Sequence, residues 1–144
     1  MRDHAVGSYG AVAIALALAL KIAAIAAAIA DGRALFVLAL APVMGRWAAV
    51  LLGATHSYVR EDDGTGSPTR WMGRTELAVA TVTAAAAAVA CGWRGEISGL
   101  LIATATGFLG LRARSRIGGV TGDVLGAGVV AAECLTLLVF AFSV

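Results

Sequence analysis

Long apolar runs separated by short polar stretches limit what this chain can fold into more than any other feature. Five runs can be read, at about residues 12–30, 34–52, 77–91, 97–111 and 124–144. Inside a bilayer, backbone N–H and C=O groups must find partners within the protein, so runs of this kind form helices. The sequence therefore predicts an all-α, polytopic membrane bundle of about five transmembrane helices, with residues 1–144 forming one membrane domain.

Composition agrees with this prediction. Hydrophobic residues make up 60% of the chain and charged residues 14%, whereas charged residues are about a quarter of a soluble domain. The runs at 77–91 and 97–111 are short for a hydrocarbon core of about 30 Å, so we expect tilting or local thinning of the bilayer there. A net charge of only +2 gives no reason to expect nucleic acid as a partner.

The arginines predict how the bundle is oriented. With alternating spans, the N-terminus shares one side of the membrane with the loops 53–76 and 112–123. The other side has two arginines, Arg33 and Arg94. The first side has seven: Arg2, Arg60, Arg70, Arg74, Arg112, Arg114 and Arg116. An excess of basic residues marks the cytoplasmic side, so we expect the N-terminus and both loops to be cytoplasmic.

Three ionisable residues fall inside the predicted spans, namely Lys21, Arg46 and Glu133. Counted from the cytoplasmic side, all three lie roughly 9–15 Å deep by helical rise. Each costs at least ~2.5 kcal/mol at such a depth, so these groups normally face one another or a cavity. We expect them to line one polar pocket that opens to the cytoplasm. The alternative is a structural pair in which Lys21 snorkels and contacts Glu133.

A second candidate site is the loop RARSRIGGVTGD at residues 112–123. Arginines bind phosphate, and glycines let backbone N–H groups approach an anion at a helix start. Asp123 can cap the last helix, as can Thr121, or it can serve a metal or phosphate site. Glu133 lies ten residues further on, about 15 Å along the helix and about 80° around it, so the two carboxylates cannot share one metal ion. The alternative is that this is only a basic loop that sets topology.

Three stretches resemble motifs of one known family, in that family's order. They are MRDHAVGSYGAVAIALALALK from residue 1, APVMGRWAAVLLGATHSYVRE from residue 41, and GGVTGDVLGA from residue 118 with Glu133 after it. Together they cover almost the whole chain. The family is cobalamin-5′-phosphate synthase, also called adenosylcobinamide-GDP ribazoletransferase.

This resemblance implies an integral inner-membrane transferase of late vitamin B12 assembly. Such an enzyme joins adenosylcobinamide-GDP to α-ribazole or its 5′-phosphate. The 5′ oxygen of the ribazole attacks the corrinoid-linked phosphorus, and GMP leaves. The cofactor that the resemblance implies is Mg²⁺, which neutralises pyrophosphate charge.

The matching residues suggest roles within this chemistry. Asp3 matches an acid of the first motif, where His4 stands in place of a serine, and the stretch EDDGTG departs from the family by one added residue. The resulting predictions fall into three groups. Metal binding is expected of Asp3 and Asp123. Catalysis is expected of Asp123, Arg46 and Glu133. Substrate binding is expected of Lys21, Arg60, Arg116, Gly119, Thr121 and Gly122.

One family feature has no counterpart in these residues. Family members are longer, and their upstream half carries the motif D-G-x-x-D-x-x-D-G, the expected main magnesium site. This chain therefore looks like a C-terminal part that would not turn over alone. A separate acid-rich N-terminal half or a second copy is the expected protein partner. Two other functions stay open: a small transporter or channel subunit, and a non-catalytic scaffold for such an N-terminal half.

Overall fold

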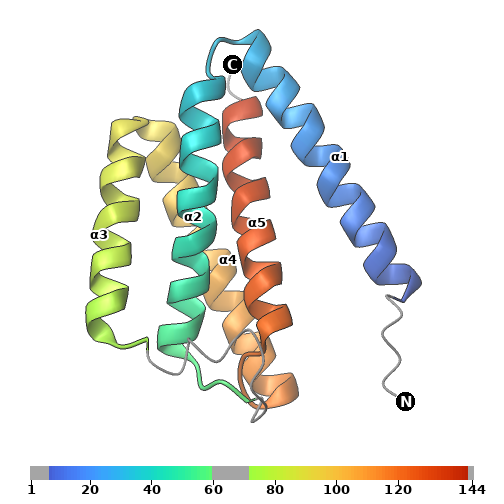
Figure 1. Ribbon diagram of the computed structural model, residues 1–144, viewed down its shortest axis with the longest axis vertical. Helices are drawn as coiled ribbons and strands as arrows, with labels where there is room; N and C mark the ends of the chain where they lie inside the picture. Colours follow the sequence, from blue (N-terminus) through green and yellow to red (C-terminus); the bar gives the residue numbers. More distant parts are fainter. Residues whose placement is uncertain (1–6, 60–71, 143–144) are drawn as a thin grey trace.

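The computed structural model describes residues 7–59 and 72–142, and these form a bundle of helices (Figure 1). Within these ranges the structure has no extended strand, so the all-α prediction is confirmed. The five predicted segments each correspond to one helix. These are α1 (Ser8–Ala30), α2 (Ala34–Thr55), α3 (Arg74–Ala90), α4 (Trp93–Ile117) and α5 (Gly122–Ala141).

Successive helices run in opposite directions, which sorts the connections onto two ends (Figure 1). The start of α1, the end of α2, the start of α3 and the α4–α5 connection at 117–122 share one end, here called the basic end because described arginines gather there. The opposite end holds the turns at 31–33 and 91–92 and the end of α5. Described arginines at the basic end are Arg74, Arg112, Arg114 and Arg116, against Arg33 and Arg94 at the opposite end.

The helix ends follow local chemistry. α4 continues past the predicted end at residue 111 to Ile117, since the arginines in its last turn favour the negative end of the helix dipole. It stops at Gly118, whose φ of 84° lies in the left-handed region that glycine adopts without strain. The Gly118 N–H donates to the Arg114 carbonyl at 3.0 Å.

The core lies around α2 and α5, which pack side by side through the middle of the bundle (Figure 1). Leu40 and Met44 of α2 are almost fully buried with Phe140 of α5. A Cβ atom on Gly128 would lie 2.7 Å from Leu52 Cδ1, so the absence of a side chain there lets the two helices approach closely.

α1 stands partly apart from the other helices. Only Ala24 and Ala28 of this helix are buried, and both lie in its second half. Toward the basic end α1 diverges from α5 (Figure 1). A groove of about 480 Å³ lies between them, lined only by small or apolar residues such as Ile14 and Val130.

Of the described helices, α1, α2 and α5 are long and apolar enough to cross a membrane. α3 has 17 residues and spans about 25 Å, which is less than a typical hydrocarbon core. α4 is longer but carries Arg94, Glu96 and three arginines near its end. Its polar ends set it apart from the three spans. A short fourth segment was expected from the sequence, whereas α4 has 25 residues because its polar turns are helical too.

Candidate functional site

The segment after α2 pairs with the segment before α5 at the basic end. The Val59 N–H donates to the Val120 carbonyl at 3.1 Å, and the Val120 N–H donates to the Ser57 carbonyl at 2.9 Å. Tyr58 and Val120 thereby form an isolated parallel bridge. The Val120 side chain is fully buried against a small cluster that includes Leu52. Two of the three sequence stretches singled out above are thus fixed side by side.

Glycines permit this close pairing. A Cβ on Gly119 would lie 2.2 Å from the Ser57 carbonyl oxygen and 2.6 Å from Val59 Cγ2, so no side chain fits at this position. On α4, a Cβ on Gly110 would lie 2.3 Å from the His56 ring. Tight packing at both glycines therefore holds the turn after α2 against α4 and the α4–α5 connection.

Thr121 is the N-cap of α5, and Asp123 is not. The Thr121 hydroxyl oxygen accepts a hydrogen bond from the Val124 N–H at 3.4 Å. Asp123 lies in the first helical turn with its side chain exposed. The helix dipole favours a carboxylate or another anion at this position. The cap thus accounts for Thr121 and leaves the Asp123 carboxylate accessible at the basic end.

The other described carboxylates do not join Asp123. Glu76 accepts a hydrogen bond from the Gly73 N–H at 2.8 Å at the start of α3. Hydrogen bonds from the Glu76 and Gly73 backbone N–H groups lower the pKa of the Glu76 carboxyl. Asp31 and Glu96 lie at the opposite end. Within residues 7–59 and 72–142, no three His, Cys, Asp or Glu side chains gather as a metal site.

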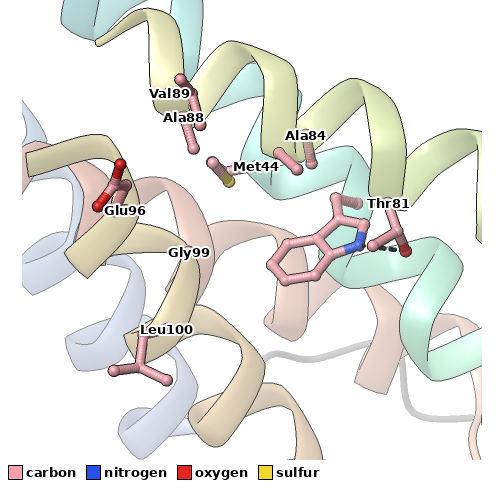
Figure 2. Close-up of a pocket in the computed structure, with 10 residues that line it drawn as sticks. Met44, Thr81, Ala84, Ala88, Val89, Glu96, Gly99 and Leu100 are labelled. Carbon is pink, nitrogen blue, oxygen red and sulfur yellow. Dashed lines mark hydrogen bonds between the residues drawn. The ribbon is translucent and has the colours of Figure 1, made fainter. Parts of the chain in front are cut away.

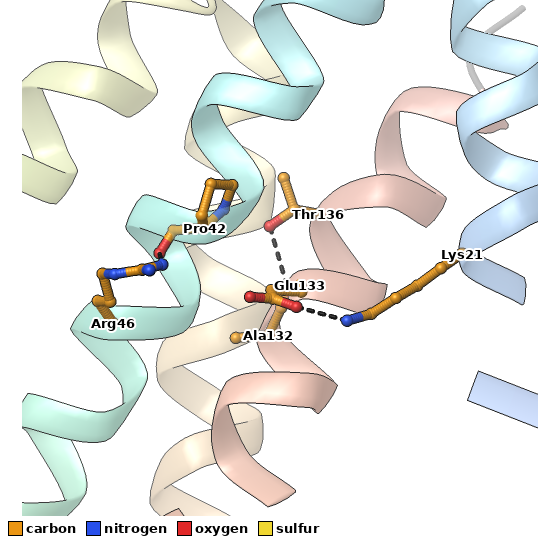
Figure 3. A network of polar contacts seen from close by, with 6 residues as sticks. All are labelled: Lys21, Pro42, Arg46, Ala132, Glu133 and Thr136. Carbon is orange, nitrogen blue, oxygen red and sulfur yellow. Dashed lines mark hydrogen bonds and ion pairs between the residues drawn. The ribbon is translucent and has the colours of Figure 1, made fainter. Parts of the chain in front are cut away.

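Lys21 of α1 and Glu133 of α5 meet between their helices (Figure 3). Lys21 Nζ lies 2.5 Å from Glu133 Oε2, and the two side chains are 24% and 22% exposed. Lys21 is about 20 Å of helical rise from the start of α1, and Glu133 is about 17 Å from the start of α5. The predicted association of these two residues is confirmed. It is a direct ion pair.

Gly45 of α2 makes room for this ion pair. A Cβ at Gly45 would lie 3.1 Å from Glu133 Cγ and 3.2 Å from Glu133 Oε1. The Glu133 carboxylate therefore lies between α1 and α2, with Lys21 on one side and the bare Gly45 backbone on the other. Gly45 was not among the residues predicted for this site. The sequence signal that could have identified Gly45 is a glycine, which has no side chain, at the same predicted depth as Glu133.

Arg46 does not join the pair, so the prediction of one pocket with three charges is wrong. The Arg46 guanidinium donates from Nη1 to the Pro42 carbonyl at 3.0 Å, and Arg46 and Glu133 lie on opposite sides of α2 (Figure 3). Consecutive helical residues differ by about 100° in direction. Because Gly45 faces Glu133, its neighbour Arg46 lies on another face, where it lines a pocket between α2 and α3.

The cavity between α2, α3 and α4 does not suit a nucleotide (Figure 2). It measures about 280 Å³ and is lined mainly by alanines and larger apolar residues such as Met44 and Leu100. Among the described residues that line it, Glu96 is charged and none is basic. Phosphate recognition calls for arginine, lysine or backbone N–H donors. Trp47 ties α2 to α3 at its edge by donating to the Thr81 hydroxyl oxygen at 3.1 Å.

The predicted site residues thus divide into three groups. Asp3 and Arg60 lie outside the described residues. Arg116, Gly119, Thr121, Gly122 and Asp123 all occur at the basic end, within the α4–α5 connection and the helix turns beside it. Lys21 and Glu133 form a pair deeper in the bundle, and Arg46 lies on the α2–α3 face, apart from the other described site residues.

Comparison with known proteins gives consistent matches. The chain matches the family described as cobalamin-5-phosphate synthase over residues 1–141. Similar curated proteins are named adenosylcobinamide-GDP ribazoletransferase. One from Syntrophobacter fumaroxidans is 38% identical over 88% of this chain and 52% of its own length. One from Desulforamulus reducens is 34% identical over 88% and 51%, and one from Klebsiella pneumoniae is 34% identical over 96% and 57%.

The chain spans about half the length of the curated relatives that it matches. No solved structure matches it. The family match nevertheless covers all five helices, including the paired segments at the basic end and the Lys21–Glu133 pair. The chain therefore belongs to the cobalamin-5-phosphate synthase family.

Proposed function

We propose that this protein is a membrane-embedded part of an adenosylcobinamide-GDP ribazoletransferase. The reaction joins adenosylcobinamide-GDP to α-ribazole or its 5′-phosphate and releases GMP. The relatives' name supports this substrate pair. One structural observation carries the proposal for this chain: two family-like stretches pair through Ser57, Val59 and Val120 at the end that presents Asp123.

The basic end suits a diphosphate chemically. Arg112, Arg114 and Arg116 come from the last turns of α4, and the first backbone N–H groups of α5 follow within a few residues. Guanidinium groups and helix N-termini are both effective donors to phosphate oxygens. We infer that these groups bind the GDP portion of the corrinoid substrate and orient its phosphorus toward the ribazole 5′ oxygen.

We also infer that Asp123 takes part in binding Mg²⁺, together with Asp3 outside the described residues. Mg²⁺ is commonly held by one or two carboxylates with substrate phosphates completing its coordination, so an exposed single carboxylate fits this mode. When bound, the ion would neutralise charge on the diphosphate and on the departing GMP. Thr121, as the cap, keeps the turn that presents Asp123 in place.

The basic end has more described arginines than the opposite end, and this excess supports a cytoplasmic position for it. The site would then face the compartment that supplies nucleotide-linked substrates. We infer an inner-membrane, multi-pass location with the paired segments on the cytoplasmic side.

The proposal is tested by product formation. The chain is co-expressed with the N-terminal half of a curated relative, and the two are reconstituted together into liposomes. This preparation should release GMP when adenosylcobinamide-GDP, α-ribazole and Mg²⁺ are all present. Omission of any one should stop release. Solute flux without GMP would favour a transporter and contradict the proposal.

A matched pair of variants separates the roles of Asp123 and Thr121. Asp123→Asn should leave thermal stability nearly unchanged and reduce Mg²⁺-dependent GMP release by at least about a hundredfold, because a metal-linked carboxylate is lost. Thr121→Ala should instead cost about 1 kcal/mol of stability through loss of the cap. Unaltered Mg²⁺-dependent GMP release in Asp123→Asn would contradict a role of Asp123 in binding Mg²⁺.

A further inference from the structure

The face of α2 and α3 that carries Arg46 has the form of a helix-docking groove. One pocket of about 220 Å³ is lined by Arg46, Val50 and Thr83, among others. Val43 lines this pocket and also a neighbouring one of about 290 Å³ that continues to Phe36. From Phe36 to Val50 the groove follows α2 for about 21 Å, which is most of the thickness of a hydrocarbon core.

Arg46 is the charged residue among the described residues that line this groove, and it lies well inside α2. It is about 14 Å of helical rise from the end of the helix at Thr55. Its side chain is exposed and turns back along the helix to the Pro42 carbonyl, so it does not extend toward the nearer, basic end. Among the described residues, no carboxylate forms an ion pair with it.

A guanidinium in this position calls for an anionic partner. Ionisable groups at membrane depth are normally paired with one another or face a cavity. Glu133, the nearest carboxylate in depth, is already paired with Lys21 on the other side of α2. The charge balance of this face is therefore incomplete within the described part of the chain.

The curated relatives contain about as much additional sequence as this chain matches. We propose that the α2–α3 groove receives a transmembrane helix from that additional part of the enzyme, and that this helix carries an Asp or Glu level with Arg46. The apolar groove takes the body of the helix, and the carboxylate takes the free N–H donors of the guanidinium. The inference rests on the proposed function, but docking is measured by binding and the proposed function by GMP release, so the two can fail separately.

A model peptide tests this docking directly. The probe is a labelled leucine–alanine helix of about 20 residues with one central Glu, and the matched probe has Gln in its place. Association with the labelled chain is measured by energy transfer in phosphatidylcholine vesicles. We expect the Glu peptide to bind about tenfold more tightly than the Gln peptide, a difference of about 1.4 kcal/mol.

Three variants of the chain locate the interaction. Arg46→Gln should abolish the preference for the Glu peptide. Thr83→Phe should weaken binding of both peptides, since Thr83 is an exposed residue that lines the groove. Ala13→Phe, at another exposed position in the separate α1–α5 groove, should leave binding unchanged.

Three outcomes would overturn the proposal: equal binding of the two peptides, a Glu preference that survives Arg46→Gln, or equal loss in Ala13→Phe and Thr83→Phe. The proposal would also be overturned if copies of the chain showed energy transfer to one another and Thr83→Phe abolished it, because a second copy would then occupy the groove.

Discussion

Replacing Glu133 alone with leucine is expected to destabilise the bundle more than replacing Glu133 and Lys21 together. The single change leaves the Lys21 ammonium without its partner at membrane depth. Removing one member of a buried ion pair typically costs about 3–5 kcal/mol, whereas replacing both members is often close to neutral. Unfolding in mixed detergent micelles would give the free energies for the two single variants and the double variant.

The exposed pair of Asp31 and Arg33 provides the control. Arg33 Nη1 lies 3.5 Å from Asp31 Oδ2, and the two side chains are 33% and 45% exposed, so removal of this pair should cost no more than about 1 kcal/mol. If the Lys21 and Glu133 effects simply add, the ion pair has no special role in holding α1. If the double variant keeps full activity in the co-expressed enzyme, both residues act only in folding.

The second large effect is expected from Gly119→Ala. Its new Cβ would lie 2.2 Å from the Ser57 carbonyl oxygen, a backbone atom that cannot move without separating the paired segments. Loss of the two backbone hydrogen bonds, together with overpacking, should cost about 3 kcal/mol and uncouple the two segments. Thermal unfolding and binding of adenosylcobinamide-GDP would both report this change.

Gly126→Ala is the matched control for Gly119→Ala. A Cβ at Gly126 would meet nothing within 4 Å. Gly126 lies in α5, the helix that follows the paired segment around Val120. Alanine favours a helix over glycine by up to about 1 kcal/mol, so this variant should be at least as stable as the wild type. Equal losses in the two variants would mean that contact with Ser57 is not the cause.

The helices could be predicted because long apolar runs dominate this sequence. The end of α4 was less predictable. The low hydropathy of Arg112 and Arg114 indicated a loop, whereas arginine is a good helix former and the helix continues through both residues. The pairing of Ser57 and Val120 had no sequence signal, because two backbone hydrogen bonds require no alternating strand pattern. Such local pairings depend on how the helices place their ends.

The charged residues illustrate what depth counting can and cannot predict. The predicted depths of Lys21 and Glu133 were enough to predict that they pair, because a charge inside a bilayer has few possible partners. Depth says nothing about rotation around the helix axis. Gly45 and Arg46 share a depth, yet only Gly45 faces Glu133. Helix packing, rather than sequence position, decides which of two neighbours enters a site.

The central claim is that the nucleotide-linked substrate binds at the basic end. Ser115→Cys places a thiol there, and Asp31→Cys places one at the opposite end, both at exposed positions and in a chain whose Cys91 and Cys134 are replaced by alanine. The rate of maleimide labelling is then measured in the co-expressed enzyme. Adenosylcobinamide-GDP with Mg²⁺ should slow labelling of Ser115→Cys and leave Asp31→Cys unchanged. Protection at residue 31 without protection at residue 115 would contradict the claim.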